Sequence, residues 1–211
     1  GLPASLSMIV MAVGQGVFNK ILIHISVNTV AAYQVAGRLD MLVFLPIFSI
    51  AASLTTLVGM FYGAKEYRAL RYIIKYGIFS ALLITIISST IVYTFAGHVV
   101  RFFTDDASIV IIAVNFLQIF AFAYPFISVG ITTGRVLQGL GKGLPVLIIT
   151  IVRVLGVSAP LALFFVFIMD KTVEWVWYSM MLSTIVAFGI GLTWLISTLK
   201  TLPTSGQSLN N

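Results

Sequence analysis

The feature that most constrains this chain is a series of long uncharged stretches separated by short clusters of charge. Four stretches contain no Asp, Glu, Lys or Arg, and they cover residues 41–64, 76–100, 107–134 and 175–199. A helix needs about 20 apolar residues to cross the hydrocarbon core of a bilayer. Each of these stretches is therefore long enough to span a membrane.

Two further apolar stretches carry a single charged residue. Residues 6–25 contain Lys20 near their end, and residues 144–169 contain Arg153 near their middle. Helices are the expected spanning form, because backbone groups left without hydrogen bonds in lipid cost several kcal/mol each. The sequence thus predicts six transmembrane helices, at about 6–25, 32–62, 76–97, 107–134, 144–169 and 175–199.

Composition supports the same class. Hydrophobic residues make up 60% of the chain and charged residues 9%, against about 25% charged residues in a soluble domain. We therefore predict an all-α integral membrane protein, with one six-helix lobe over residues 1–200 and a tail over residues 201–211. Because the chain opens with Gly1 rather than Met, we expect a fragment or a processed half of a longer protein.

The net charge of +6 does not indicate nucleic-acid binding, because the basic residues lie at helix ends and form no single basic face. Segments on one side hold Lys65, Arg68, Arg71, Lys75, Arg135, Lys142 and Lys200, and segments on the other hold Lys20, Arg101 and Lys171. The positive-inside rule places the first group in the cytoplasm. It predicts a multi-pass protein of the cell (inner) membrane with a cytoplasmic C-terminus.

Enzyme signatures are missing from the sequence. There is no cysteine, no His-Glu-x-x-His and no Gly-x-Ser-x-Gly, and Asp40 is the one carboxylate within the expected spans. An intramembrane aspartyl enzyme would need two carboxylates that share a proton. We predict that the chain is not an enzyme, has no catalytic residue or metal site, and uses no cofactor.

Three charged residues within the spans need an explanation, because each costs about 2.5–3.5 kcal/mol at mid-depth in a bilayer. Arg38 and Asp40 lie two positions apart on one helix and so cannot pair with each other. Asp40 is either a cation or proton site, a counter-charge for a cationic substrate, or an interfacial carboxylate bound to an Arg or a helix end. Arg153 lies near mid-depth and should face a cavity, meet a partner lobe, or bind free backbone carbonyls as a structural lock.

Local signals within the spans predict bends and one helix start. Pro46, Pro125 and Pro160 each remove a backbone donor and can bend their helices. Thr104 or Asp105 is expected to cap the fourth span, where a short polar side chain can accept hydrogen bonds from free N–H groups.

At this point the pattern resembles a known family. The stretch AAYQVAGRLDMLVFLPIFSIAASLTTLVGMFYGAKEYRALR, residues 31–71, is similar to the second helix and following loop of a lobe of multidrug and toxic compound extrusion (MATE) transporters. Other similarities lie in the opening Gly1-Leu2-Pro3, in VVRFFTDD after the third span and in VLQGLGKG before the fifth. The resemblance covers essentially the whole chain and identifies it as a C-terminal six-helix lobe.

The resemblance implies a twelve-helix secondary transporter with two lobes around a central cleft, which exchanges cationic lipophilic compounds for Na⁺ or H⁺. Several family members use a Glu in the first helix of this lobe and an Asp in its fourth helix for coupling. Those places are Met11 and the neighbourhood of Ser128 here, and neither is acidic. Coupling then rests on the missing N-terminal lobe or on Asp40.

The resemblance also implies a substrate cleft and a partner. Gln34 matches a family glutamine that can line the cleft, and the expected wall of the cleft is Met8, Met11, Gln15, Gln34, Phe44 and Tyr124. The expected partners are the N-terminal lobe, small cationic substrates and the bilayer. Two other functions stay open: a lipid-linked saccharide flippase of the same superfamily, and a non-transporting membrane subunit.

Overall fold

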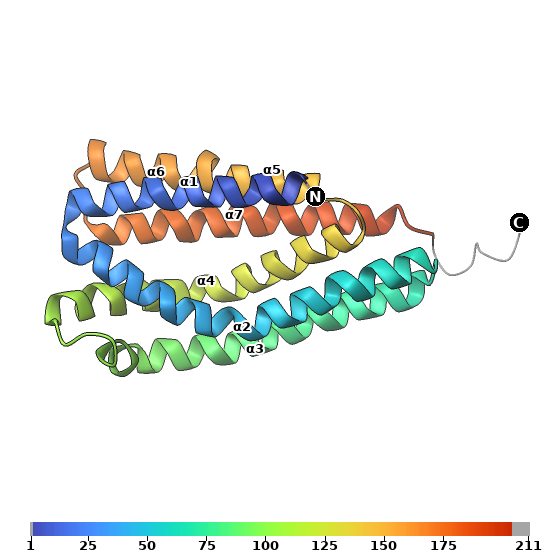
Figure 1. The fold of residues 1–211 in the computed structure, drawn as a ribbon, viewed down its shortest axis with the longest axis horizontal. Helices are drawn as coiled ribbons and strands as arrows, with labels where there is room; N and C mark the ends of the chain where they lie inside the picture. The colour runs from blue at the N-terminus through green and yellow to red at the C-terminus, as the bar shows by residue number, and fades with distance from the viewer. Residues whose placement is uncertain (1, 204–211) are drawn as a thin grey trace, which may run out of the picture.

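The computed structural model describes residues 2–203, in which helices are joined by short turns and loops (Figure 1). Six helical segments are long and apolar enough to cross a membrane. They are α1 (Leu2–Ile25), α2 (Val27–Gly63), α3 (Tyr67–Arg101), α4 (Ala107–Gly139), a fifth segment over Leu144–Ile168 and α7 (Val173–Lys200). The predicted all-α integral membrane fold is confirmed.

The fifth segment is not a regular α-helix. It consists of α5 (Leu144–Ile151), a π-helical stretch η1 (Val152–Ser158), α6 (Ala159–Leu163) and a second π-helical stretch η2 (Phe164–Ile168). Pro160 lies between the two π-helical stretches and cannot donate a backbone hydrogen bond, so the ladder cannot continue unchanged around it. Wider π turns are a common adjustment at such points and frequently occur at functional sites.

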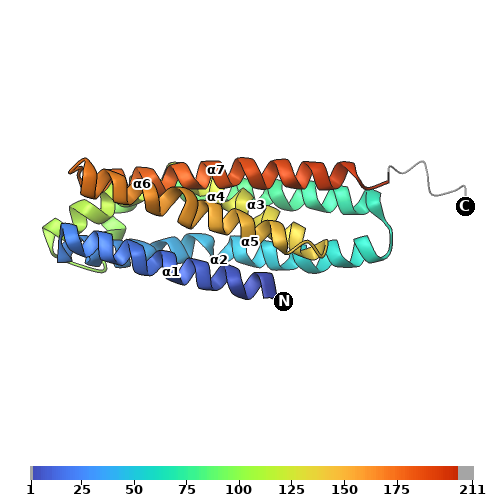
Figure 2. The ribbon, with the colours of Figure 1, turned by 90° about the horizontal axis from the view of Figure 1, so that it is seen from above.

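The helices form two groups that lie side by side. Figure 1 shows α2, α3 and α4 together in one group, and α1, α7 and the fifth segment in the other. All three pairs within the first group pack against each other, while α1 and α7 both contact α5 and η1. The two groups meet where α4 packs against α7 and α1 against α2. The view from above in Figure 2 shows the helices nearly parallel along one long axis.

The core is mainly aromatic where the two groups meet. The rings of Phe116 and Trp177 meet edge to face at 4.9 Å, and Tyr33 stacks on Trp177 at 5.8 Å. Trp177 and Phe116 are buried, and they belong to a cluster that continues through Tyr124 and Phe44. Such ring pairs contribute about 0.5–1.5 kcal/mol beyond their buried area.

Side-chain contacts bring the basic segments together at one end of the bundle. Arg71 at the start of α3 donates to the backbone oxygens of Leu199 and Leu202, at 2.9 and 3.0 Å. Lys142 donates to Thr198 over 3.4 Å. At the opposite end, Asn28 donates to Ser108 over 2.8 Å. Residues 204–211, most of the predicted cytoplasmic tail 201–211, lie outside the described residues.

The two other prolines within spans lie inside continuous α-helices. Pro46 lies within α2 and Pro125 within α4. Figure 1 shows that α2 changes direction near its middle. With 37 residues α2 is about 55 Å long, well above the roughly 30 Å of a bilayer core. The bend and a tilt together allow a helix of this length to fit a membrane.

The predicted cap of the fourth span is wrong by one or two positions. α4 begins at Ala107, and Asp106 is its N-cap. The Asp106 carboxylate accepts hydrogen bonds from the backbone N–H of Ser108 at 2.9 Å and of Ile109 at 3.4 Å. Thr104 instead accepts from the N–H of Asp106 over 3.3 Å, so it stabilises the loop that precedes the cap. Thr104, Asp105 and Asp106 are adjacent and can all act as an N-cap, so the sequence did not reveal which of them would precede the first turn of α4.

The cap makes stability depend on pH. Hydrogen bonds from the hydroxyl of Ser108 and from two backbone N–H groups hold the pKa of Asp106 below its ordinary value of 3.8. A carboxyl whose pKa falls on folding stabilises the fold above its unfolded pKa, and this contribution is lost as the pH falls through the folded pKa. We expect Asp106→Asn to melt at a lower temperature than the native protein near neutral pH, with a difference that begins to shrink near pH 3.8 and disappears only below the lower pKa of the folded state.

Melting curves of the detergent-purified transporter over a range of acidic to neutral pH measure this difference. Asp105→Asn is the matched control, because Asp105 is exposed and is not the cap. A melting difference for Asp106→Asn that stays constant with pH would contradict the assignment.

Candidate functional site

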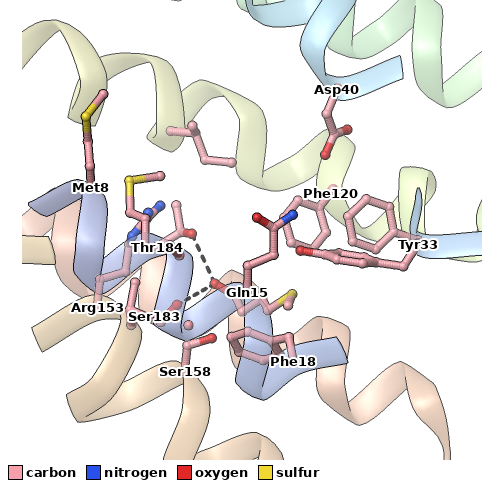
Figure 3. A pocket seen from close by; sticks show the side chains of 17 residues that line it. Met8, Gln15, Phe18, Tyr33, Asp40, Phe120, Arg153, Ser158, Ser183 and Thr184 are labelled. Carbon is pink, nitrogen blue, oxygen red and sulfur yellow. Dashed lines mark hydrogen bonds between the residues drawn. The ribbon is translucent and has the colours of Figure 1, made fainter. Parts of the chain in front are cut away.

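A cavity lies inside the bundle between the two groups of helices. Its volume is about 550 Å³, within the range of roughly 300–1,000 Å³ for small-molecule sites. Residues from α1, α2, α4, the fifth segment and α7 form its wall (Figure 3). They are Met8, Met11, Ala12, Gly14, Gln15, Phe18, Tyr33, Asp40, Phe116, Phe120, Ile127, Arg153, Val154, Ser158, Met180, Ser183 and Thr184.

Asp40 forms one side of the cavity. Its carboxylate accepts a hydrogen bond from the hydroxyl of Tyr124, which α4 supplies from the neighbouring helix. Tyr124 is fully buried, and its ring meets Phe44 edge to face at 5.3 Å. A charged acceptor in a low-dielectric site requires such a donor, because an unpaired charge there is strongly destabilising. The carboxylate is therefore held in place while it still faces the cavity.

Removal of the Tyr124 hydroxyl should destabilise the protein. Tyr124→Phe keeps the ring against Phe44 and deletes the donor to Asp40, and hydrogen bonds to charged groups contribute about 1.5–3 kcal/mol. We expect a loss of this size in the free energy of unfolding. Chemical denaturation of the purified transporter measures it, with Tyr93→Phe on the exposed face of α3 as the control. The loss should shrink in an Asp40→Asn background, and an equal loss in both backgrounds would exclude the coupling.

Arg153 forms the other side of the cavity. It belongs to η1, and Figure 3 shows its guanidinium pointing inward from the side opposite Asp40. Among residues 2–203 the guanidinium has no hydrogen-bond or ion-pair partner, so it does not lock onto the carbonyls near Pro160. Hydroxyl groups of the same wall lie on Ser158, Ser183 and Thr184. An intramembrane charge with this surrounding is a functional-site hypothesis by default.

Between the two charges, the wall is mostly apolar with a few polar groups. Gln15 and the Tyr33 hydroxyl lie in the middle of the cavity in Figure 3. Phe116 and Phe120 stack at 4.2 Å on the α4 side. Methionines line the rest, and their flexible, polarisable side chains suit ligands of varied shape. Methionine lining is supplied by Met8, Met11 and Met180.

The predicted site residues either line the cavity, lie directly behind it, or lie outside it on the surface of α2. Met11, Gln15, Asp40 and Arg153 line the cavity. Phe44 and Tyr124 lie directly behind it and support Asp40.

Gln34 and Arg38 are exposed on α2 and do not line the cavity. They are one helical turn apart on one face, whereas Tyr33 and Asp40 are two turns apart on another. That Gln34 lines a cleft between two lobes stays a prediction.

Several wall residues were not singled out from the sequence. Tyr33 lies seven positions before Asp40, which is about two helical turns, so both side chains are on the same face of the helix. This spacing is a signal that could have identified Tyr33. The pair Ser183-Thr184 is a polar interruption in the last apolar span, and both hydroxyls donate to the backbone oxygen of Met180. Phe116 and Phe120 carry no such signal, since aromatic residues are common throughout the spans.

Protein ligands for a metal are not gathered at this site. No group of three or more His, Cys, Asp or Glu side chains suited to a metal ion occurs among residues 2–203. One carboxylate with a hydroxyl and an amide nearby can accept a proton, a monovalent cation or the cationic group of an organic compound. The arrangement can thus bind and release charge, and it lacks the paired groups of an acid–base catalyst.

Six apolar spanning helices around an internal cavity with intramembrane charges define a multi-pass membrane protein of the transporter class. The chain belongs to the MatE family, whose family model matches residues 3–164. Members of this family are transporters and not enzymes, so the prediction that the chain is not an enzyme is confirmed.

Relatives with similar sequences carry names of multidrug resistance proteins. The chain is 27% identical over 162 residues to the probable multidrug resistance protein NorM of Thermotoga maritima, covering 77% of this chain and 35% of that protein. It is 28% identical over 177 residues to the probable NorM of Bacillus cereus, covering 82% and 37%.

Solved structures agree on the fold. A MATE transporter in the straight conformation superposes with a TM-score of 0.89 at 28% identity, covering 96% of this chain and 45% of that one. A MOP superfamily transporter from Pyrococcus furiosus, described as having a binding pocket of reverse polarity, gives 0.89 at 28% identity over 97% and 46%. The chain therefore spans somewhat less than half the length of these transporters. Its alignments with the two sequence relatives cover about a third of the length of each relative.

Proposed function

We propose that this chain is the C-terminal half of a cation-coupled multidrug efflux antiporter, which exports cationic lipophilic compounds in exchange for Na⁺ or H⁺. The observation that carries the proposal is the internal cavity with the Asp40 carboxylate on its wall, in a chain of the MatE family. Relatives named as multidrug resistance proteins support the substrate class.

The chemistry of the cavity suits a large, weakly hydrated cation. A carboxylate supplies the opposite charge, and the ring faces of Phe120 and Tyr33 that are turned to the cavity can attract a cation by about 0.5–2 kcal/mol each. Proton or Na⁺ binding at Asp40 would neutralise the same carboxylate. Substrate and coupling ion would then compete for the Asp40 carboxylate. Binding of the ion would release the substrate, and this competition is sufficient for exchange.

The partner in this proposal is the N-terminal lobe of the same transporter. Solved structures of the family are about twice as long as this chain, which supports a second lobe. Met8 and Met11 line the cavity and are also strongly exposed, so the cavity opens along α1. A second lobe that rocks against this face would open the cavity to either side of the membrane in turn.

The basic end of the bundle supports an orientation. Arg71, Lys142 and the last turn of α7 lie at the same end, together with the turn after α2. The positive-inside rule then places this end and the C-terminus in the cytoplasm, and the protein in the cell (inner) membrane.

The test is transport by the full transporter that contains this chain, reconstituted in proteoliposomes. Ethidium efflux is measured under an Na⁺ gradient and under an H⁺ gradient separately. Efflux driven by one gradient would establish the antiporter and name the ion. The 211-residue chain alone serves as the control and should not transport, because half of the cleft is missing.

An absence of efflux under both gradients would reject the proposal in favour of a flippase or a non-transporting subunit. A flippase for a lipid-linked saccharide needs a strongly cationic cleft for pyrophosphate. Among residues 2–203, Arg153 is the one cationic side chain in the wall of the cavity, since Arg38 lies outside it. The flippase therefore ranks second.

A further inference from the structure

One side of α3 carries exposed side chains that are sorted by polarity along the helix. Their spacings of one, three or four positions place them on a single face. The first part of this face is basic and phenolic, and the part that follows is purely apolar. We call it the outer face of α3, and it consists of Arg68, Tyr72, Lys75, Tyr76, Phe79 and Leu83.

The opposite face of α3 is buried, which fixes the rotation of the helix. It carries Leu70, Ile74, Gly77 and Ala81. The backbone at Gly77 lies so close to α2 that an added methyl group would be 2.6 Å from Cδ1 of Leu54. α3 packs chiefly against α2 and α4, at the edge of the bundle that Figure 1 shows away from the fifth segment. The outer face is therefore turned to the lipid, whereas the cavity opens along α1.

The length of the helix places the two parts of this face at different depths in the membrane. Residues 76–100 of α3 carry no charge and span about 38 Å. A bilayer measures about 30 Å across its hydrocarbon core and about 40–45 Å with its headgroups. Lys75 therefore lies at the level of the headgroups, and Phe79 and Leu83 lie at the level of the acyl chains.

The basic side chains of the outer face are available to an anion. Arg68 and Lys75 are exposed, whereas Arg71 between them donates to the backbone oxygens of Leu199 and Leu202. Glu66 is the only acidic residue between positions 62 and 104. The positive potential at this end of α3 is thus left uncompensated over the outer face.

Two further features of the helix start favour a negative group. The dipole of a helix favours negative charge at its N-terminus, yet the first turn of α3 contains Arg68 and no acidic residue. Tyr72 and Tyr76 stack at 6.4 Å beside the basic residues, and they are 72% and 62% exposed. Tyrosine is enriched at membrane interfaces, where its ring contacts apolar groups and its hydroxyl remains in the polar layer.

We propose that the outer face of α3 binds an anionic phospholipid of the cytoplasmic leaflet. The phosphate lies between Arg68 and Lys75, and the acyl chains lie along Phe79 and Leu83. Anionic lipids give the cytoplasmic leaflet its negative surface potential, which attracts Lys and Arg at the membrane surface. The inference goes beyond the proposed function and takes from it only the orientation in the membrane.

A tryptophan on the outer face can report which lipid lies against it. Leu83 is about 12 Å further along the helix than Lys75, near the middle of an acyl chain, so Leu83→Trp is the reporter. The full transporter is placed in nanodiscs of phosphatidylglycerol and phosphatidylcholine in equal amounts, with bromine midway along the chains of one lipid or the other. Bromine quenches tryptophan on contact, and the signal of the transporter without the reporter is subtracted. We expect brominated phosphatidylglycerol to quench more strongly, with a preference of at least about fivefold over phosphatidylcholine.

Charge variants in the reporter background locate the phosphate. Lys75→Gln should reduce the preference about fivefold, and Arg68→Gln together with Lys75→Gln should remove it. Arg135→Gln is the matched control, because it removes an exposed basic residue of α4 at the same end of the bundle and should leave the preference unchanged. The native preference should also fall between about 0.1 M and 1 M salt, since screening shortens from about 10 Å to 3 Å.

Three results would overturn the inference. Equal quenching by both lipids would leave the basic residues with a role in topology only. Quenching by neither lipid would show that protein covers the outer face. An equal loss in Arg135→Gln and Lys75→Gln would indicate a diffuse surface potential in place of a binding site.

The assay stands apart from the test of transport. If Leu83→Trp does not purify as a single species, Phe79→Trp on the same face is the reporter. Both leaflets of the nanodiscs have the same composition, so the result does not depend on the orientation. A preference for phosphatidylglycerol without gradient-driven efflux would reject the antiporter and support this inference, and efflux without the preference would do the reverse.

Discussion

The Asp40→Asn transporter is expected to lose gradient-driven efflux of cationic compounds, with rates about 10- to 100-fold below native. The asparagine side chain keeps the shape of the aspartate and can still accept a hydrogen bond from Tyr124. It carries no charge, so it can neither take up a proton nor bind a cation as the carboxylate does. Any coupling that the variant retained would have to use an acidic residue in the other lobe. Efflux assays in proteoliposomes under separate Na⁺ and H⁺ gradients measure the effect.

A matched control separates the charge from general damage. Asp106→Asn makes the same chemical change at an exposed helix cap, and it should retain efflux at neutral pH. Melting temperatures of both variants show whether the fold is intact. Native efflux in a well-folded Asp40→Asn transporter would place coupling in the N-terminal lobe and leave Asp40 with a structural role.

The Gly139→Ala variant is expected to be markedly less stable than the native protein. A methyl group at Gly139 would lie 2.7 Å from the backbone oxygen of Thr55 and 2.9 Å from Cγ1 of Val58. These atoms belong to α2, and the backbone oxygen cannot move away without a shift of that helix against α4. Overpacking of this kind typically costs about 1–3 kcal/mol, which outweighs the gain of up to about 1 kcal/mol from alanine in a helix.

Gly130→Ala on the same helix is the control for Gly139→Ala. No atom lies within 4 Å of the methyl group it would add, so the gain in helix propensity should remain. Chemical denaturation of the purified transporter should give a lower free energy of unfolding for Gly139→Ala and an equal or higher one for Gly130→Ala. Equal stability of the two variants would show that α2 and α4 do not pack this closely.

The membrane class and the number of helices follow from the sequence, for a simple physical reason. Lipid accepts only long apolar segments with internally satisfied backbones, so runs such as 107–134 leave one possible structure. The charged residues within the spans could also be identified as unusual from the sequence, because a charge within the hydrocarbon core of a bilayer is costly. Asp40 and Arg153 were both recognised as requiring a partner or a cavity, and both line the cavity.

Tertiary structure alone decided which residues meet. Tyr124 lies far from Asp40 along the chain, and only the packing of α4 against α2 brings its hydroxyl to the carboxylate. The rotation of α2 exposes Gln34 and Arg38 while it turns Tyr33 towards the cavity, which residue type does not reveal. The π-helical stretch η1 contacts α1 and α7 and presents Arg153 on the side of the cavity opposite Asp40. Six membrane-spanning helices with charges inside them could be predicted from residue types alone, because lipid penalises other arrangements of such long apolar segments. The helix faces on which those charges lie, and the side chains they meet, depend on helix packing.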